Sequence, residues 1–348
     1  MARHIWLGLD GLRGIAVLAV VVFHLSVGWA TNGYVGVDIF FALSGFLITW
    51  LLLDERARTG RIGLPQFYMR RVLRLYPALF VTVVGVLLLG VLADQIGRVL
   101  PGALAALAYV ANWWIYAGNE AVLLEHTWTL AIEEHFYLVW PILVILLTSR
   151  SVRLRTVGVT TALVLSAIVL TRWPEAIEGV RGSYVRGAPI IWGSLLAALL
   201  RRFPPGRRIR LAAGPIGLLA LVALLVVVTI PAALPIGWMG GLRSFPGLLA
   251  VLVIAVSVIE PTSFAERVLS WEPLRWVGKR AYGIYLYHFP IIMVLSFQLD
   301  FGLPRWAVAM LALALTLAMA GVSYRWLETP FLRLKRRYSP AAAPIPST

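Results

Sequence analysis

The sequence predicts an all-α fold: a polytopic integral membrane bundle of about ten helices. Of its 348 residues, 60% are hydrophobic and only 14% are charged, and the mean hydropathy is +0.84. Soluble domains average roughly 45–50% apolar and about 25% charged residues. Apolar stretches of about 20 residues, the length at which a helix crosses a bilayer, recur from one end of the chain to the other.

The ten predicted spans follow one another through short polar connections. They cover residues 9–30, 35–53, 75–93, 134–149, 156–172, 185–200, 211–230, 243–259, 281–298 and 306–327. A further apolar stretch, 102–117, is short for a crossing. If it crossed, every later cluster of basic residues would lie outside the cell. We therefore interpret it as re-entrant or interfacial, with both termini in the cytoplasm.

Basic residues gather between the apolar stretches. Lys and Arg number 31 against 16 Asp and Glu, which gives a formal net charge of +15. The positive-inside rule explains this excess, so we expect no nucleic-acid partner. With no cysteine, the chain can form no disulfide, thiolate nucleophile or cysteine metal site. We expect no bound metal or cofactor. Residues 1–335 should form one membrane domain, and residues 336–348 a disordered tail rich in Pro and Ala.

The first span carries ionisable residues, which cost about 2.5–3.5 kcal/mol each at membrane depth and so indicate function. Arg13 and His24 are eleven residues apart. That spacing returns to nearly the same helix face, about 16 Å farther along the axis. Asp10 lies one turn before Arg13. Histidine is well suited to proton transfer near neutral pH, although Asp10 and Arg13 also fit a boundary ion pair, and His24 a packed interior histidine.

The second span is interrupted by Asp38 and Ser44. Asp38 should lie at about the depth of His24, where a carboxylate would fix the tautomer of the imidazole. Asp38 would alternatively cap the outer end of the helix. Ser44 would then serve close helix packing.

Two further charged groups precede the third and fourth spans. Arg71 and Arg74 are one helical turn apart and are suited to clamping phosphates by forked hydrogen bonds. They also fit ordinary positive-inside charge. Glu133 shares a helix face with Tyr137, and Glu134 and His135 are expected to be solvated at the interface.

Together and in this order, these segments resemble the acyltransferase 3 family of membrane proteins. The resemblance covers about residues 8–335. Its motifs are Arg13 and His24 with ten residues between them, Arg71 and Arg74, and the stretches 36–47, 128–134, 282–290 and 324–331. Two mild departures are Thr129 in place of serine and Tyr287 in place of tryptophan. The chain ends soon after the last span, so we expect no fused extracytoplasmic domain.

The resemblance implies transfer of an acyl group, often acetyl from acetyl-CoA, to a hydroxyl of a carbohydrate, glycolipid or macrolide-like small molecule. The enzyme would lie among the lipids of a bacterial plasma membrane. His24 would act as a general base or as a transient acyl carrier. Asp38 or Glu133 would orient it. The candidate substrate-binding residues are Arg13, Arg71, Arg74, Ser44, Tyr137 and His288, with the arginines at the CoA phosphates.

Two other classes of function are open at this point. A transporter or flippase of an acyl or sugar conjugate would also place charges within the membrane. Transporters, however, often have related halves, and the sequence contains no internal repeat. A non-catalytic scaffold or sensor would leave the polar stripe of the first span unexplained.

Overall fold

The computed structural model describes residues 6–25, 32–151, 153, 187–229, 245–298 and 302–338. All regular secondary structure in these ranges is helical, as the sequence predicts. The chain divides into two compact units. Unit one comprises residues 1–47 and 186–321, and unit two comprises residues 48–185 and 322–348.

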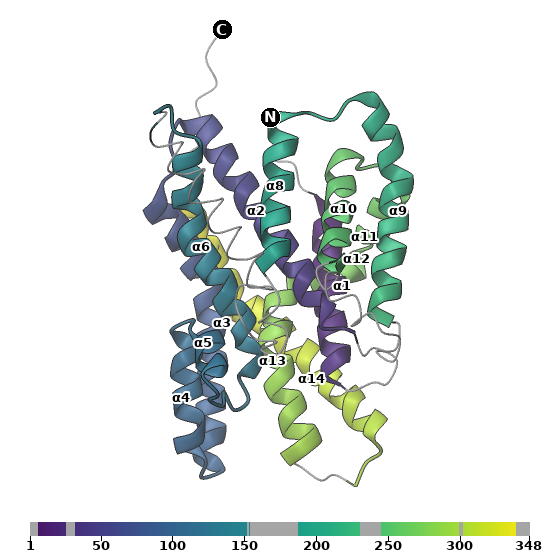
Figure 1. The fold of residues 1–348 in the computed structure, drawn as a ribbon. Coiled ribbons are helices and arrows are strands. Elements are labelled where there is room, and N and C mark those ends of the chain that lie inside the picture. The colour runs from purple at the N-terminus through teal and green to yellow at the C-terminus, as the bar shows by residue number, and fades with distance from the viewer. Residues whose placement is uncertain are drawn as a thin grey trace. The chain divides into compact units, whose positions relative to one another are not determined.

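Unit one contains Arg13 and His24, the two residues of the first predicted motif. Its helices are α1 (Leu7–His24), the first half of α2 (Val35–Thr59), α8 (Ala188–Arg202), α9 (Arg207–Thr229), α10 (Phe245–Ile259), α11 (Phe264–Leu269), α12 (Glu272–Lys279), α13 (Ala281–Met293) and most of α14 (Arg305–Ser323). A π-helical turn, η5 (Val294–Gln298), extends α13. Helices α9 and α10 lie side by side, as do α1 and α12 (Figure 1).

Helix α1 packs closely against α11 and α12 because one of its faces is made of glycines. A Cβ atom built on Gly11 would lie 1.8 Å from the carbonyl oxygen of Leu269, and one on Gly14 would lie 2.4 Å from that of Leu274. Small residues at such positions let two backbones approach each other. This close packing of α1 against α11 and α12 positions His24 at the C-terminal end of α1.

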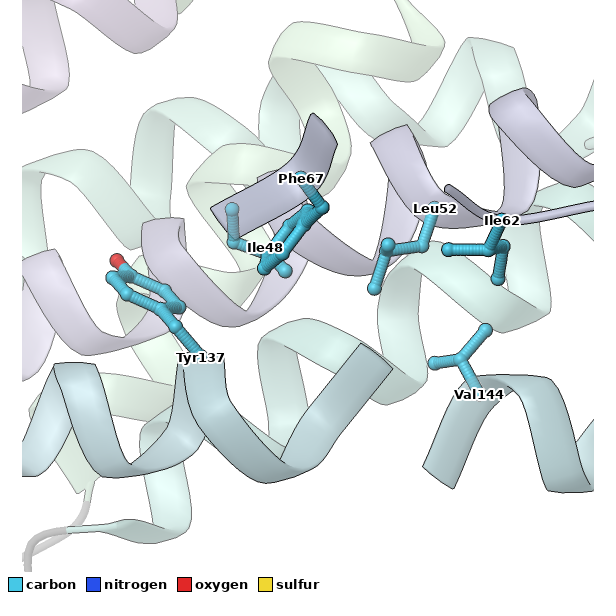
Figure 2. Close-up of a cluster of buried hydrophobic side chains, with 6 residues drawn as sticks. All are labelled: Ile48, Leu52, Ile62, Phe67, Tyr137 and Val144. Atoms are coloured by element: carbon cyan, nitrogen blue, oxygen red, sulfur yellow. The ribbon is translucent and has the colours of Figure 1, made fainter. Parts of the chain in front are cut away.

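Unit two holds the second half of α2, followed by α3 (Leu64–Leu92), α4 (Ile96–Leu107), α5 (Ala111–Tyr116), the 3-10 turn η1 (Glu125–Thr127) and α6 (Trp128–Leu147). The chain returns to it as the π-helical turn η6 (Tyr324–Glu328), α15 (Thr329–Lys335) and the 3-10 turn η7 (Arg336–Tyr338). Figure 2 shows the buried cluster between α2, the α2–α3 loop, α3 and α6. Its members are Ile48, Leu52, Ile62, Phe67, Tyr137 and Val144.

An ion pair ties together the polar end of unit two. Nη2 of Arg70 lies 2.8 Å from Oε2 of Glu55, and both side chains are largely buried. The other oxygen of Glu55 accepts from the backbone N–H of Gly63, and Nη1 of Arg70 donates to the carbonyl oxygen of Tyr338. Arg70 is therefore a residue whose contacts hold unit two together.

Six helices of the described residues are long and apolar enough to cross a membrane: Leu7–His24, Val35–Thr59, Leu64–Leu92, Glu125–Leu147, Arg207–Thr229 and Arg305–Tyr338. The predicted count of ten is not confirmed. Helices α8, α10 and α13 have 15, 15 and 13 residues, fewer than the about 20 of a straight crossing. The predicted span 156–172 and the tail from Ser339 onward lie outside the described residues.

The apolar stretch 102–117 forms no single helix. It is divided between α4, with 12 residues, and α5, with 6 residues. Neither is long enough to cross a bilayer alone.

Two helices begin before the membrane spans predicted from hydropathy. Helix α3 begins at Leu64 and contains the predicted span from residue 75, and α6 begins at Trp128 and contains the predicted span from residue 134. Both helices therefore include the charged residues that precede those spans. Tertiary partners satisfy some of these charges, among them Arg70 and Arg71.

Candidate active site

A pair of histidines from the two ends of the sequence meets in unit one. His24 is the last residue of α1, and His288 lies in α13. Nε2 of His288 is 3.2 Å from Nδ1 of His24, and the ring centroids are 5.0 Å apart. His288 is completely buried, with 0% exposure, and His24 is partly buried. Both were candidate residues from the sequence, which did not predict their contact.

A backbone carbonyl assigns the proton of the His24 ring. Nδ1 of His24 lies 2.9 Å from the carbonyl oxygen of Val20. A carbonyl oxygen only accepts, so Nδ1 must carry a hydrogen. In the neutral ring the lone pair is then on Nε2, which has no hydrogen-bond partner within the described residues. Such a nitrogen is suited to accept a proton or to attack a carbonyl carbon.

Aromatic rings surround the His24 imidazole. The rings of Phe23 and Phe289 each lie 5.1 Å from it, both in edge-on contact. The ring of Tyr34 in turn lies 5.9 Å from that of Phe23. These walls are apolar, and they keep the base in a region of low dielectric constant, where each hydrogen bond is stronger than in water.

Arg13 is separated from this pair. Its Nη1 lies 3.2 Å from Oδ1 of Asp10, and each side chain is about one quarter exposed. The ion pair that the sequence offered as one of two interpretations of Asp10 and Arg13 is therefore present. Arg13 and His24 are eleven positions apart on one helix, which puts their Cα atoms about 16 Å apart.

The two candidates of the second span lie in the part of α2 that belongs to unit one. Asp38 is in the first turn of α2 and only 5% exposed, and Ser44 is partly buried. The position beside Nδ1 of His24 is occupied by Val20 and His288. An orienting role for Asp38 stays a prediction.

Unit two brings together the candidates of the third and fourth segments. The guanidinium of Arg71 lies over the ring of Tyr137, 4.7 Å from its centroid, and over Phe67 at 5.6 Å. The hydroxyl of Tyr137 donates a long hydrogen bond of 3.4 Å to Oε2 of Glu133, which confirms that the two share a helix face. Glu133 and Glu134 both interact electrostatically with Arg71. A partly buried cation therefore joins α3 to a pair of carboxylates on α6.

Arg74 differs from Arg71 in its surroundings. It is partly buried, and within the described residues it forms no ion pair. The sequence presents the two arginines as an equivalent pair. In the structure the charge of Arg71 is already neutralised by carboxylates, whereas the charge of Arg74 is available to a ligand.

Sequence reasoning missed the aromatic wall residue Phe289 and the two carbonyl groups, of Val20 and Tyr285, that hold the histidine rings. For the Tyr285 carbonyl the sequence contained one weak signal, namely the spacing of three residues between Tyr285 and His288 on a predicted helix. In the described part of the chain no three His, Asp or Glu residues are grouped so as to hold a metal ion.

Comparison with known proteins gives a consistent family. The family described as acyltransferase domain matches residues 6–325. A peptidoglycan O-acetyltransferase of Listeria monocytogenes is 36% identical over 345 residues, which is 92% of this chain and 55% of the relative. A candidate O-acetyltransferase of Staphylococcus aureus is 36% identical over 347 residues, 93% of this chain and 57% of the relative.

A candidate peptidoglycan O-acetyltransferase of Bacillus subtilis is 34% identical over 346 residues, 93% of this chain and 54% of the relative. The chain thus spans about half the length of the curated relatives it matches. None of these three is named as a transporter, so the comparisons do not favour that interpretation. No solved structure matches the chain significantly.

Proposed function

The chain belongs to the acyltransferase family that matches residues 6–325, and from this premise we propose that it transfers an acyl group from acyl-CoA to a sugar hydroxyl of peptidoglycan. We expect the acyl group to be acetyl, because the relatives are named O-acetyltransferases, and two of the three are named for peptidoglycan. The six long apolar helices support a location in the bacterial cell membrane. The observation that carries the proposal is the lone pair on Nε2 of His24.

The chemistry assigned to His24 is general base catalysis. Nε2 takes the proton of the acceptor hydroxyl while that oxygen attacks the carbonyl carbon of the thioester. The C–O bond forms, and the C–S bond breaks as the tetrahedral intermediate collapses. The proton on Nε2 passes to the departing thiolate, which leaves as CoA, and the ester remains on the acceptor. The reaction balances with no other reactant.

The position of His24 at the carbonyl end of α1 supports this role. The backbone carbonyls of a last helical turn carry a partial negative charge. They stabilise the imidazolium that exists between the two proton transfers. The apolar rings of Phe23 and Phe289 limit the access of water, which would otherwise compete with the acceptor for the acyl group.

Arg74 is the residue we assign to the donor phosphates. Its guanidinium has no carboxylate partner in the described residues, and arginine suits forked hydrogen bonds to phosphate. Arg71 supports the same region through Tyr137, and its net attraction for phosphate is reduced by Glu133 and Glu134.

The direct test is product formation by purified protein in detergent. The protein is incubated with radiolabelled acetyl-CoA and a peptidoglycan-derived disaccharide, and acetylated sugar is separated from free acetate. We expect alkali-labile ester on the sugar. His24→Ala protein that purifies as the parent does should form none. A transporter makes no product without compartments. If folded parent protein forms no ester on the peptidoglycan-derived disaccharide, the proposal is refuted.

A further inference from the structure

We propose that His288 is a positioning residue, which fixes the tautomer and the orientation of the His24 ring through a direct imidazole–imidazole hydrogen bond. The inference rests on the proposed function, because it adds a residue to the same reaction. It also changes the role expected for His288, which the sequence placed among the substrate-binding candidates.

The backbone of α13 decides which nitrogen of His288 is protonated. Nδ1 of His288 lies 2.6 Å from the carbonyl oxygen of Tyr285, three residues earlier. The carbonyl can only accept, so Nδ1 donates, and the neutral ring keeps its lone pair on Nε2. His288 is 0% exposed. Its protonation pattern is therefore set by the protein and not by solvent.

Nε2 of His288 accepts a hydrogen bond from the protonated Nδ1 of His24. Nε2 of His288 is 3.2 Å from Nδ1 of His24, whose hydrogen is already required by the Val20 carbonyl. The two acceptors act from different helices. Val20 holds the ring against its own helix α1, whereas His288 holds it against α13. Together they prevent the ring flip that would exchange Nδ1 and Nε2.

Both ring nitrogens of His288 are engaged within the protein. Nδ1 is bonded to Tyr285 and Nε2 to His24. The buried ring consequently has no polar atom left with which to bind a substrate. His288 can influence the reaction only through His24.

A neutral imidazole is a suitable partner for a base in apolar surroundings. It accepts the Nδ1–H bond without adding a second buried charge, which would be costly. When Nε2 of His24 takes the hydroxyl proton, the Nδ1–H donor becomes part of a cation, and its bond to His288 becomes charge-assisted and stronger. The stabilisation therefore increases at the step in which the proton is transferred.

The first test examines the parent protein and uses a variant only to assign its resonances. The full-length protein with nitrogen-15 histidine is examined by solid-state NMR in lipid, and His24→Gln identifies the resonances of His24. We expect Nδ1 of His24 to be protonated and Nε2 unprotonated in the neutral ring, with a through-bond coupling between Nδ1 of His24 and Nε2 of His288. A neutral His24 protonated on Nε2 would overturn the inference.

The second test compares two variants at His288. His288→Gln can still accept from His24 through its amide oxygen, whereas His288→Leu cannot. We expect His288→Leu to lower kcat by about 10–100-fold and His288→Gln to recover most of that loss, as is typical of outer partners of functional imidazoles. The KM for acetyl-CoA should change little in both. His135→Gln, which removes an imidazole from unit two, is the control.

The outcomes separate this inference from the proposed function. If His24→Ala abolishes transfer but folded His288→Leu retains the parent kcat, only the positioning role is wrong. If His24→Ala retains transfer, the base assignment is wrong and the role of His288 falls with it. If His288→Leu does not fold, the tautomer of the parent and the kcat of His288→Gln still decide.

Discussion

The guanidinium of Arg71 lies 4.7 Å from the centroid of the Tyr137 ring, and this contact joins α3 to α6. A cation over an aromatic face contributes about 0.5–2 kcal/mol, more when it is desolvated. Glu133 and Glu134 on α6 add negative charges that attract the Arg71 guanidinium. These partners explain how an arginine is accommodated within a largely apolar helix, and they leave Arg74 as the arginine free to bind an anion.

Arg74→Gln should therefore weaken donor binding more selectively than Arg71→Gln. Loss of one charged hydrogen bond to phosphate costs about 1.5–3 kcal/mol, so the KM for acetyl-CoA should rise about 10–100-fold while kcat changes less. The dependence of KM on salt should also decrease, because a screened ion pair has been removed. Steady-state kinetics at several salt concentrations measure both effects.

A matched control for Arg74 is Arg98→Gln. Arg98 is also on the α3–α4 side of unit two but forms an exposed pair with Glu120. Its removal should leave the KM and its salt dependence unchanged. Equal effects of Arg98→Gln and Arg74→Gln would mean that only the general charge of the protein matters.

Tyr137 should act on stability through its ring more than through its hydroxyl. Tyr137→Phe removes the hydroxyl that donates the 3.4 Å bond to Glu133, so we expect a decrease in unfolding free energy of less than about 1 kcal/mol. Tyr137→Leu also loses the surface beneath Arg71 and leaves a space in the buried cluster of Figure 2. There we expect a decrease of about 2–3 kcal/mol. Thermal unfolding in detergent compares the two, and equal shifts would contradict the ring-based explanation.

The sequence predicted well what depends on neighbours within one helix. The ion pair of Asp10 with Arg13 and the shared face of Glu133 with Tyr137 both follow from helical spacing. The contact of His24 with His288 does not, because 264 residues separate them. No periodicity along the chain carries information about which helices become neighbours.

The same limit applies to the charged residues at the start of α3. Hydropathy began the third span at residue 75, beyond Arg70, Arg71 and Arg74. Helix α3 continues through all three, and two of them have tertiary partners, since Glu55 pairs with Arg70 and Tyr137 stacks with Arg71. Charges satisfied by tertiary partners do not end a helix, and those partners are invisible to a window of hydropathy.

His24→Gln should slow turnover strongly without preventing folding. The amide keeps a donor near the Val20 carbonyl but has no basic nitrogen, so we expect kcat to fall by about 10²–10⁴-fold, the usual contribution of a positioned base. The parent should also show no acetyl group on His24. Rapid acid quench of the parent with acetyl-CoA alone, followed by mass spectrometry of the peptide, tests this directly. Acetylated His24 formed at the rate of turnover would replace the general-base route by an acyl-histidine route.

The final prediction concerns the contacts between the N-terminal part of α1 and α11, which position His24 at the other end of α1. The backbone N–H of Gly8 donates a 2.8 Å hydrogen bond to Oε1 of the buried Glu266, which satisfies a donor that a first helical turn leaves unpaired. Ser270 donates to the same oxygen.

Glu266→Gln preserves an accepting oxygen and should cost less than about 1 kcal/mol of unfolding free energy, whereas Glu266→Leu leaves the Gly8 donor buried and unpaired, at about 1–3 kcal/mol. Gly11→Ala should be worse than both, because its Cβ would meet the backbone carbonyl of Leu269 at 1.8 Å, where no side chain can move aside. Thermal unfolding should rank the three variants in that order. Activity measured well below each unfolding temperature should fall most in Gly11→Ala, since a displaced α1 also displaces Nδ1 of His24 from His288. A Gly11→Ala protein with the parent's stability and kcat would show that the close approach of α1 to α11 does not set the geometry of the histidine pair.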